Sequence, residues 1–389
     1  MRKGWEYKKL GEVCDITMGQ SPDGNSINEA NGVEFHQGKT CFGERFLGVS
    51  PLYSNAPTKL AEAHSVLLCV RAPVGYPNIT DRKICIGRGL CALYAKQEID
   101  NTFLFYSLLG KQAYFEKNAT GSTFKAISSK TVSNTTLSIP PKSTQLAIVS
   151  ELDKINELIR LKKEQLKDFD NLAQSLFYEM FGDPVENEKG WEVKKLGEIS
   201  SLICNGNTPK GGSEVYVDNG ILFLRSQNVW KNRLDLDDVA FIDEATHKTL
   251  KKSALNHHDL LITKTGRVNT ENSSLGRTAL FEGEDGSANI NGHVYLVRLK
   301  EGMVHKYVLY ILISNSYREL IRRTCVGGID KRQLNKNHIE DFPIILPPLP
   351  LQRLFAQRIE QIEREKSEVQ KSIQDLETLL ASRMQYWFE

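Results

Sequence analysis

Two segments of the chain carry hydrophobic residues at steps that alternate between three and four residues. The seam positions are Ile148, Leu152, Ile155, Ile159, Leu166 and Phe169 in the first segment, and Phe355, Ile359, Ile362, Val369, Ile373, Leu376 and Leu380 in the second. A mean spacing of 3.5 residues, sustained over about four heptads, is typical of a coiled coil. Lys162 and Lys366 also fall on seam positions, where a charge costs stability and fixes register. We expect the two helices to pair with each other in antiparallel orientation; pairing between two copies of the chain is the alternative.

Proline pairs mark where each helix is expected to begin. Pro140-Pro141 and Pro347-Pro348 precede the two segments, and proline is tolerated in a first helical turn because the N–H groups there have no partner within the helix. Thr144 is a candidate N-cap, and Gly182 is expected to end the first helix. These signals predict a central helix over 142–182 and a C-terminal helix over 347–389.

The remaining parts, 1–141 and 183–346, contain short apolar runs between Gly, Pro and Asn. The predicted strands are 65–70, 84–86, 222–224, 259–263 and 293–297, and apolar helical stretches lie near 102–109 and 307–312. The expected fold class is therefore α+β, with two strand-rich globular domains separated by two long helices.

The chain is also an internal duplication. Gly-Trp-Glu-x-Lys-Lys-Leu-Gly-Glu begins at Gly4 and returns at Gly190, and a Gly-x-Ser/Thr-Pro turn follows each copy, at Gly19 and at Gly206. Pro-Pro-x-x-x-Gln closes both halves. A repeat near 200 residues indicates a duplicated domain rather than a solenoid. The interiors between the shared motifs differ, which suggests two modules that do the same kind of work on different targets.

Composition narrows the class of protein. The 389 residues are 40% hydrophobic and 25% charged, as in ordinary globular chains. No apolar run approaches the roughly 20 residues of a membrane helix, and no signal peptide precedes Trp5, so no membrane partner is expected. Seven scattered cysteines without a Cys-x-x-Cys pair indicate free thiols and a cytoplasmic location.

No catalytic or metal-binding motif stands out. Gly32 to Thr40 has five residues between its glycines where a phosphate-binding loop needs four, and the Asn/Asp-Pro-Pro-aromatic signature of amino-methyltransferases does not occur. His257-His258-Asp259 resembles a metal site, but adjacent strand residues point to opposite faces and no distant ligand set completes it. We therefore expect a non-enzymatic chain with no catalytic residue, no metal and no cofactor of its own.

Charge alone does not identify the partner. The net charge is +2, and residues 1–141 carry 16 basic and 12 acidic side chains while 182–346 carry 22 of each. Several Gly-rich loops nevertheless mix Arg and Lys with Asn, Gln, Ser and Thr. Arg reads guanine and Asn or Gln read adenine by paired hydrogen bonds, and Lys, Ser and Thr hold phosphates, so these loops are candidates for nucleic-acid contact.

The order and duplication of the motifs resemble a known family. Trp5–Glu12, Gly19–Pro22 and the stretch from Gly121-Ser122-Thr123 to Pro141 and Gln145, with second copies from Trp191, Gly206, Gly327-Gly328 and Pro347, are similar to the specificity (S) subunit of type I restriction–modification enzymes. The resemblance covers essentially the whole chain. It implies two target recognition domains, 1–141 and 183–346, each reading one half of a bipartite, asymmetric double-stranded DNA site. It also implies that the conserved helices 142–182 and 347–389 separate them.

The same resemblance implies the partners. Two modification subunits would dock on the helices and methylate adenine N6 with S-adenosylmethionine, and motor subunits would hydrolyse ATP with Mg²⁺ and cleave DNA. Loop position and side-chain chemistry, rather than family matches, give the candidate DNA-binding residues: Arg71, Arg88, Lys125, Arg225, Gln227, Lys264, Arg267, Asn291 and Lys331.

Two other functions fit the pattern. A subunit of a related fused system, in which one partner both methylates and cleaves, would have the same sequence features. A coiled-coil adaptor whose duplicated domains bind protein would differ in showing no salt-dependent binding of DNA.

Overall fold

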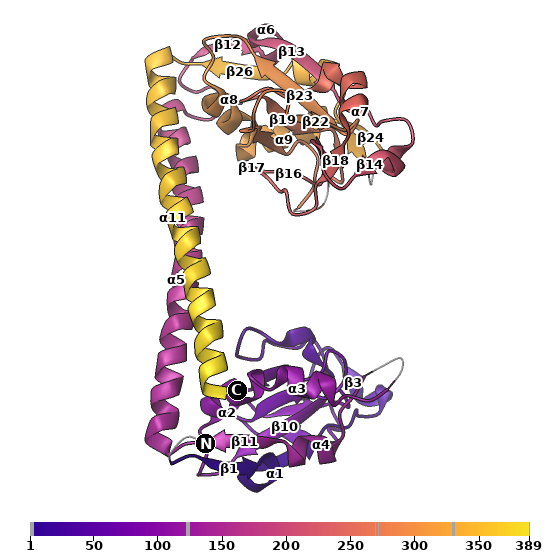
Figure 1. Cartoon of the computed structure of the whole chain (residues 1–389), viewed down its shortest axis with the longest axis vertical. Helices are drawn as coiled ribbons and strands as arrows, with labels where there is room; N and C mark the ends of the chain where they lie inside the picture. Colours follow the sequence, from indigo (N-terminus) through magenta and orange to yellow (C-terminus); the bar gives the residue numbers. More distant parts are fainter. Residues whose placement is uncertain (1–3, 122–124, 269, 271, 329–330, 389) are drawn as a thin grey trace. The chain divides into compact units, whose positions relative to one another are not determined.

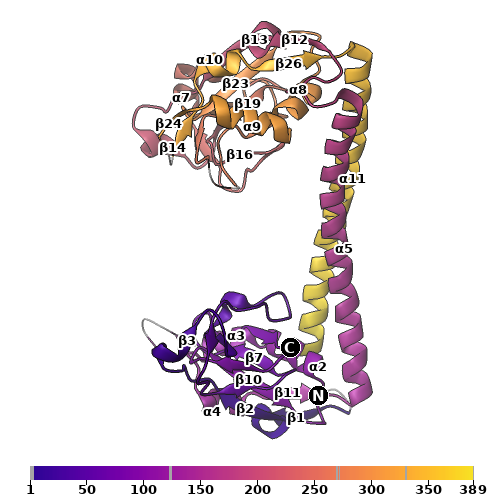
Figure 2. The same cartoon turned by 180° about the vertical axis from the view of Figure 1, so that it is seen from behind.

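The computed structural model of the chain describes residues 4–121, 125–268, 270, 272–328 and 331–388, and it divides into two compact units (Figures 1 and 2). The first unit comprises Met1–Glu164 together with Gln370–Glu389, and the second comprises Gln165–Val369. Both contain helices and strands, so the α+β fold class is confirmed. The division into four domains predicted from the sequence stays a prediction. Of the quoted motifs, Ser122 and Thr123 lie outside the described residues.

Two 40-residue helices, α5 (Lys142–Phe181) and α11 (Leu349–Phe388), run through both units. They begin directly after the proline pairs. Thr144 is not the N-cap of α5, because the carbonyl of Pro141 already accepts hydrogen bonds from the N–H groups of Thr144 (2.8 Å) and Gln145 (3.0 Å). The helix therefore starts two residues before that threonine. Gly182, with φ of 76°, ends it as expected.

In each unit, α5 and α11 lie side by side (Figure 1). In the first unit, Glu151 pairs with Arg383, and Lys163 lies 2.9 Å from Glu377. In the second unit, Asp170 pairs with Lys366. Partner numbers fall along α11 as they rise along α5, so the helices are antiparallel, and these contacts form within one chain.

The seam residues differ in how deeply they are buried. Nine are buried, namely Ile148, Leu152, Ile155, Ile159, Phe355, Ile359, Ile362, Val369 and Ile373. Leu166, Phe169, Leu376 and Leu380 are half-buried. Towards the C-terminal end of α5, Phe177 and Phe181 take the buried positions and pack against Phe355, with ring centroids 5.5 and 5.4 Å away. Here the coiled coil merges into the core of the second unit.

Over its described residues, the first unit has two main sheets, a two-stranded sheet and four short α-helices. The main sheets have the orders β2-β10-β7-β8 and β3-β5-β4-β9-β6, and β1 pairs with β11. The strands are β1 (Glu6–Lys9), β2 (Cys14–Met18), β3 (Ile27–Asn28), β4 (Val33–His36), β5 (Tyr53–Ser54), β6 (Leu60–Ala61), β7 (Val66–Cys69), β8 (Pro77–Ile79), β9 (Ile84–Ile86), β10 (Leu90–Ala95) and β11 (Thr136–Ile139). The helices are α1 (Leu10–Val13), α2 (Asn101–Leu109), α3 (Gln112–Lys117) and α4 (Ser129–Asn134).

The second unit has two four-stranded sheets, β13-β23-β19-β21 and β14-β18-β15-β22, with smaller sheets β12-β26, β16-β17 and β20-β25-β24. Its strands are β12 (Glu192–Lys195), β13 (Ser200–Asn205), β14 (Tyr216–Val217), β15 (Ile221–Leu224), β16 (Val229–Trp230), β17 (Arg233–Leu234), β18 (Ala240–Ile242), β19 (Leu260–Thr263), β20 (Thr265–Gly266), β21 (Thr278–Leu280), β22 (Ala288–Ile290), β23 (Val294–Leu299), β24 (Val326–Gly327), β25 (Arg332–Gln333) and β26 (Pro343–Leu346). Its short helices are α6 (Leu196–Ile199), α7 (Glu244–Thr249), α8 (His305–Leu312), α9 (Asn315–Thr324) and α10 (Lys336–Glu340).

The two units share their topology even where their sequences differ. In one sheet, β2, β10, β7 and β8 take the places that β13, β23, β19 and β21 take in the other. Each unit also contains a parallel pair of strands, β4 with β9 in the first unit and β15 with β22 in the second. The duplication visible in the flanking motifs therefore extends through the divergent interiors.

The repeated motifs have the same structural roles in both units. Leu10 and Leu196 are fully buried. The carboxylate two residues later accepts the N–H that begins each short helix, at 3.0 Å from Lys9 to Glu12 and 2.7 Å in the second copy. In the Pro-Pro-x-x-x-Gln motif, the buried Gln145 donates to the carbonyl of Pro140 at 2.9 Å. Gln352 donates likewise to Pro347.

The Gly-x-Ser/Thr-Pro motif is explained by a close backbone approach. A Cβ atom on Gly19 would stand 2.1 Å from the carbonyl oxygen of Gly87, and one on Gly206 would stand 1.9 Å from that of Ile290. Both distances are far below a van der Waals contact. Glycine is therefore needed where the chain leaves β2 or β13 and passes the residues just before β10 or β23.

One expectation about His257 and His258 is wrong. They precede β19 instead of lying on it, and their rings lie close together, with centroids 3.8 Å apart and planes tilted by 39°, rather than pointing to opposite faces. His258 has φ of 69°, outside the extended conformation of a strand. Asp259 is engaged with Arg298 at 2.7 Å. Over the described residues, no group of three or more His, Cys, Asp or Glu could hold a metal ion.

All seven cysteines are free thiols. Within the part of the chain that the structure describes, no helix is both long and apolar enough to span a bilayer.

A buried ion-pair network supports β4 of the first unit. The Glu34 carboxylate, 10% exposed, accepts from Arg82 Nε (2.6 Å) and Nη2 (2.7 Å), from the Ser50 N–H (2.7 Å) and shares a hydrogen bond with His36. Burial opposes ionisation of Glu34, but the hydrogen bonds from Arg82, Ser50 and His36 outweigh it and lower its pKa to about 2. Burial also lowers the pKa of His36, so the ring is neutral near pH 7.

The aromatic junction predicts a large loss of stability on truncation. Replacing Phe355 with alanine should lower the free energy of unfolding of the second unit by about 3–5 kcal/mol, because it leaves a cavity among packed rings. Urea denaturation measures the change. The matched control is Leu354→Ala, 41% exposed on the same helix, which should alter stability by less than about 0.5 kcal/mol. Equal effects of the two substitutions would contradict this packing.

The Glu34 network predicts a dependence of stability on pH. Because the folded pKa lies below the ordinary value of 4.5, the ionised carboxylate stabilises the first unit above pH 4.5, and this contribution disappears as the pH falls towards about 2. Glu34→Gln should reduce stability at pH 7 and flatten the fall between pH 4.5 and 2, as followed by urea midpoints. Glu62→Gln, which alters an exposed pair with Lys83, should leave the profile unchanged. Parallel profiles for wild type and Glu34→Gln would refute the assignment.

Candidate nucleic-acid interface

A polar hollow of about 160 Å³ lies on the loops of the first unit. Arg71, Arg88, Gln37 and Lys39 line it together with Gly38, Cys69, Ala72, Pro73 and Gly89. Arg71 follows β7, Arg88 lies between β9 and β10, and Gln37 follows β4. The structure thus brings Arg71 and Arg88 together, as side chains on three converging loops.

Backbone hydrogen bonds hold these loops in place. The Gly87 N–H donates to the His36 carbonyl at 2.8 Å, and the Val70 N–H donates to the Gly89 carbonyl at 2.9 Å. A Cβ atom on Gly89 would stand 2.3 Å from the Gln37 carbonyl oxygen, so only glycine allows the loops to meet. The Glu34 network anchors β4 just before Gln37. The four polar side chains therefore project from a rigid base.

Lys125 is joined to the same region through its backbone. Its carbonyl accepts from the Ala72 N–H at 3.0 Å, and Ala126 bridges both Arg71 and Thr120. The Lys125 side chain is exposed and does not line the hollow.

A second polar hollow, of about 570 Å³, lies on the second unit. Arg267 and Lys331 line it with Thr265, Gly266, Thr270, Asn272, Ser273 and Ser274. The small sheet β20-β25-β24 forms its base, because Gly266 pairs with Arg332 and Arg332 pairs with Gly327. Two cations and several hydroxyl and amide groups therefore share one open surface.

The predicted residues Arg225 and Gln227 do not line that hollow. Arg225 Nη2 lies 3.2 Å from Asp238 Oδ1 and 2.8 Å from the Asp238 carbonyl, and Gln227 Nε2 donates to Asp238 Oδ2 at 2.7 Å. Both are thus engaged with Asp238, which lies on a different loop, between β17 and β18. A base contact would require them to share or exchange that partner.

The side chains of Asn291 and Lys264 are partly engaged by other groups of the second unit. The Asn291 N–H donates to the Leu224 carbonyl at 3.0 Å, and its side-chain oxygen accepts from the His293 N–H at 3.0 Å, which leaves the amide NH₂ as its donor to a ligand. Lys264 is half-buried, with Nζ 5.8 Å from the Tyr295 ring centroid.

The candidate residues occupy equivalent places in the two topologies. Arg71 follows β7 as Lys264 follows its counterpart β19, and Arg88 precedes β10 as Asn291 precedes β23. Lys125 precedes Ala126, which pairs with Arg71, and Lys331 precedes Arg332, which pairs with Gly266. The same edge of each unit therefore carries loops of similar position and different chemistry.

Sequence reasoning missed Gln37 and Lys39. They follow β4, the counterpart of β15, after which Arg225 and Gln227 come. Lys39 Nζ lies 3.7 Å from the Tyr76 ring centroid, which holds the ammonium at the hollow. No predicted strand precedes Gln37, whereas the predicted strand 222–224 precedes Arg225, so the match between the two loops becomes visible only in the shared topology.

Both hollows carry cationic side chains together with amide or hydroxyl groups that can donate and accept hydrogen bonds. Their described lining residues supply guanidinium, ammonium, amide and hydroxyl groups, and none is a carboxylate. Such a set suits phosphate oxygens and the acceptor atoms on base edges.

Comparison with known proteins agrees with this geometry. The family model described as "Type I restriction modification DNA specificity domain" matches residues 2–168 and 188–378. The type I restriction enzyme MjaIX specificity subunit of Methanocaldococcus jannaschii is 25% identical over 97% of this chain and 91% of its own length. A putative specificity subunit, MjaX, of the same organism is 38% identical over 44% of this chain and 41% of its own length.

Solved structures share the fold. A chain from a structure titled for complex assembly and conformational transition of the type I R-M system covers 100% of this chain and 98% of its own length, with a TM-score of 0.65 and 20% identity. The type I restriction–modification S subunit from M. genitalium covers 99% and 96%, with a TM-score of 0.54 and 15% identity. Because the family model matches most of both halves, this chain belongs to the type I restriction modification DNA specificity family.

Proposed function

We propose that this chain is the DNA-reading subunit of a type I restriction–modification complex, and that each globular unit reads one half of a bipartite, asymmetric site. The observation that carries the proposal is the equivalence of the two loop sets: one topology presents donor groups twice, at matching places, with different side chains. Two unlike half-sites need such an arrangement. Arg71 with Arg88 suits guanine-containing sequence, and Asn291 suits adenine.

In this role the chain itself catalyses no bond formation or cleavage. Its role is to position DNA, and methylation of adenine N6 with S-adenosylmethionine belongs to modification subunits. Motor subunits would supply ATP hydrolysis with Mg²⁺ and cleavage. The guanidinium, ammonium, amide and hydroxyl groups of both hollows support this division of labour, because such groups bind phosphate oxygens and base edges.

We also propose that the outer faces of α5 and α11 bind the modification subunits. Leu172 on α5 and Leu379 on α11 are 52% and 45% exposed. Their separation, 379 − 172 = 207, equals that of the two proline pairs, 347 − 140 = 207, so they are equivalent positions of the duplication. Exposed leucines on helices favour association with an apolar partner surface. Two equivalent patches would accept two copies of one partner.

The experiment that tests the proposal is methylome sequencing of cells that express this chain with its modification subunit. A two-part motif with a fixed spacer is the expected result. Methylation without sequence preference, or purified complex that binds DNA with no dependence on salt, would overturn it in favour of a protein adaptor.

Arg88→Ala should relax sequence preference at one base pair of one half-site. Loss of a paired guanidinium contact to guanine costs about 1–3 kcal/mol of discrimination, and the other half-site should be unaffected. Binding of single-base variants of the methylated site measures this. Lys83→Ala, an exposed cation of the same unit paired with Glu62, is the control and should leave the preference intact. Uniform weakening on every sequence would instead make Arg88 a phosphate contact.

Leu172→Glu and Leu379→Glu should each remove one modification subunit from the complex, and the double variant should remove both, because a carboxylate cannot be buried unpaired in an apolar interface. Native mass spectrometry gives the stoichiometry. Gln374→Glu places the same charge on an exposed position of α11 and should leave two copies bound. Full occupancy in the double variant would refute this docking surface.

A further inference from the structure

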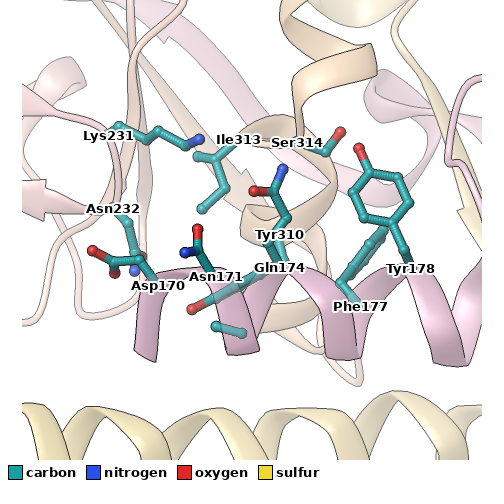
Figure 3. Close-up of a pocket in the computed structure, with 11 residues that line it drawn as sticks. Asp170, Asn171, Gln174, Phe177, Tyr178, Lys231, Asn232, Tyr310, Ile313 and Ser314 are labelled. Atoms are coloured by element: carbon teal, nitrogen blue, oxygen red, sulfur yellow. The ribbon is translucent and has the colours of Figure 1, made fainter. Parts of the chain in front are cut away.

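Three cations of the second unit, none of them among the candidate DNA-binding residues, line a hollow together with Trp230. Lys231, Arg277 and Arg318 line a hollow of about 150 Å³ together with Trp230, Asn272, Ser273, Leu275, Gly276, Thr278, Leu312 and Ile313. Lys231 and Ile313 also line a neighbouring hollow of about 280 Å³ that α5 borders (Figure 3). Both hollows are large enough to admit a hydrated or polyatomic group.

Arg277 is held in a fixed orientation. Its Nε donates to the Ser273 carbonyl at 3.1 Å and its Nη2 to the Asn272 carbonyl at 2.5 Å. Its guanidinium lies 3.9 Å from the Trp230 ring centroid. A guanidinium fixed on an aromatic face is preorganised to donate through its remaining edge.

No carboxylate among the described residues forms an ion pair with Lys231 or Arg277. Asp170 is the acidic group that acts on Lys231, and its carboxylate is already paired with Lys366 of α11. The seam lysine thus neutralises the acid that would otherwise balance the hollow. Figure 3 shows the Lys231 amine directed towards Ile313, away from Asp170.

Without a bound anion, the neighbouring cations of this hollow repel one another. Partial desolvation and the nearby Arg318 lower the pKa of Lys231, and the same two causes lower the pKa of Arg277. The Trp230 Nε1 atom is buried and has no hydrogen-bond partner among the described residues. An anion in this hollow would relieve the repulsion between its cations.

We propose that this hollow binds a phosphate group. Lys231 follows β16, Arg277 precedes β21 and Arg318 lies on α9. Cations from three separate elements suit the several oxygens of a tetrahedral anion better than a planar carboxylate. The hairpin β16–β17 has no counterpart among the described strands of the first unit, so the site is specific to the second unit. The phosphate group could belong to the DNA backbone, and in that case the inference rests on the proposed function. It could instead belong to a free phosphate-bearing small molecule.

Lys231→Gln is the test variant, since Lys231 is exposed and donates no hydrogen bond within the described chain. Lys194→Gln is the matched control, because it removes the same charge from the exposed strand β12 of the same unit. Both variants are prepared as the full chain with its modification subunit. The first arm measures duplex affinity against salt concentration, on the methylated site and on random sequence. The second arm measures the melting temperature in sodium phosphate and in sodium chloride at equal ionic strength.

For a backbone phosphate, Lys231→Gln should weaken binding of both duplexes by the same factor and reduce the slope of log affinity against log salt by about 0.9. For a free phosphate, Lys231→Gln should lose the stabilisation by phosphate that wild type and Lys194→Gln retain, with DNA binding unchanged. Either result supports the site and identifies its source.

A Lys231→Gln protein that matches wild type in both arms overturns the inference while leaving the proposed function intact. Wild-type complex that shows no sequence-specific binding in the first arm would refute the proposed function instead, and the second arm would still decide whether the hollow takes phosphate.

Discussion

Both globular cores are completed by both long helices, and this shared packing is the constraint on which the rest of the structure depends. In the first unit, Ile148 and Leu152 of α5 and Phe388 of α11 belong to the same buried cluster as Phe103. In the second, Phe177 and Phe181 of α5 join Phe355 and Ile359 of α11. Neither helix is therefore a linker in the ordinary sense. Removing one would expose the apolar base of a globular core, and the loops that carry the candidate DNA contacts would lose their support.

Much of the architecture could be predicted because it is written in local patterns. The 3.5-residue period indicated α5 and α11 within two residues at their starts, and short apolar runs indicated β7, β9, β15, β19 and β23. Sequence alone could not predict that Phe177 and Phe181 take the buried positions at the C-terminal end of α5. These side chains pack against Tyr307 and Phe355, which are far away in sequence. The order of the sheets depends in the same way on pairings between distant strands, such as β2 with β10.

The candidate interface was predictable by region and less so by residue. Gly-rich loops with mixed basic and amide side chains pointed to one edge of each unit, since strand ends and tight turns occur there, and their role in DNA contact stays a prediction. What a side chain does in its loop depends on a partner that sequence does not reveal. Asp238 binds Arg225 and Gln227, whereas Arg71 and Arg88 converge because β7 pairs with β10, with Cys69 opposite Leu90. The same limit explains why Arg277, fixed by Trp230 and two carbonyl groups, gave no signal.

The division of the cores between distant segments also sets the order in which they can close during synthesis. The second unit is one continuous stretch, Gln165–Val369, whereas the first needs Gln370–Glu389 in addition to Met1–Glu164. A chain that leaves the ribosome from its N-terminus can therefore complete the later unit before the earlier one. Until Trp387 and Phe388 emerge, Trp5 lacks its stacking partner and Phe103 remains uncovered. The nascent first unit would then be the natural client of a chaperone that shields apolar surface.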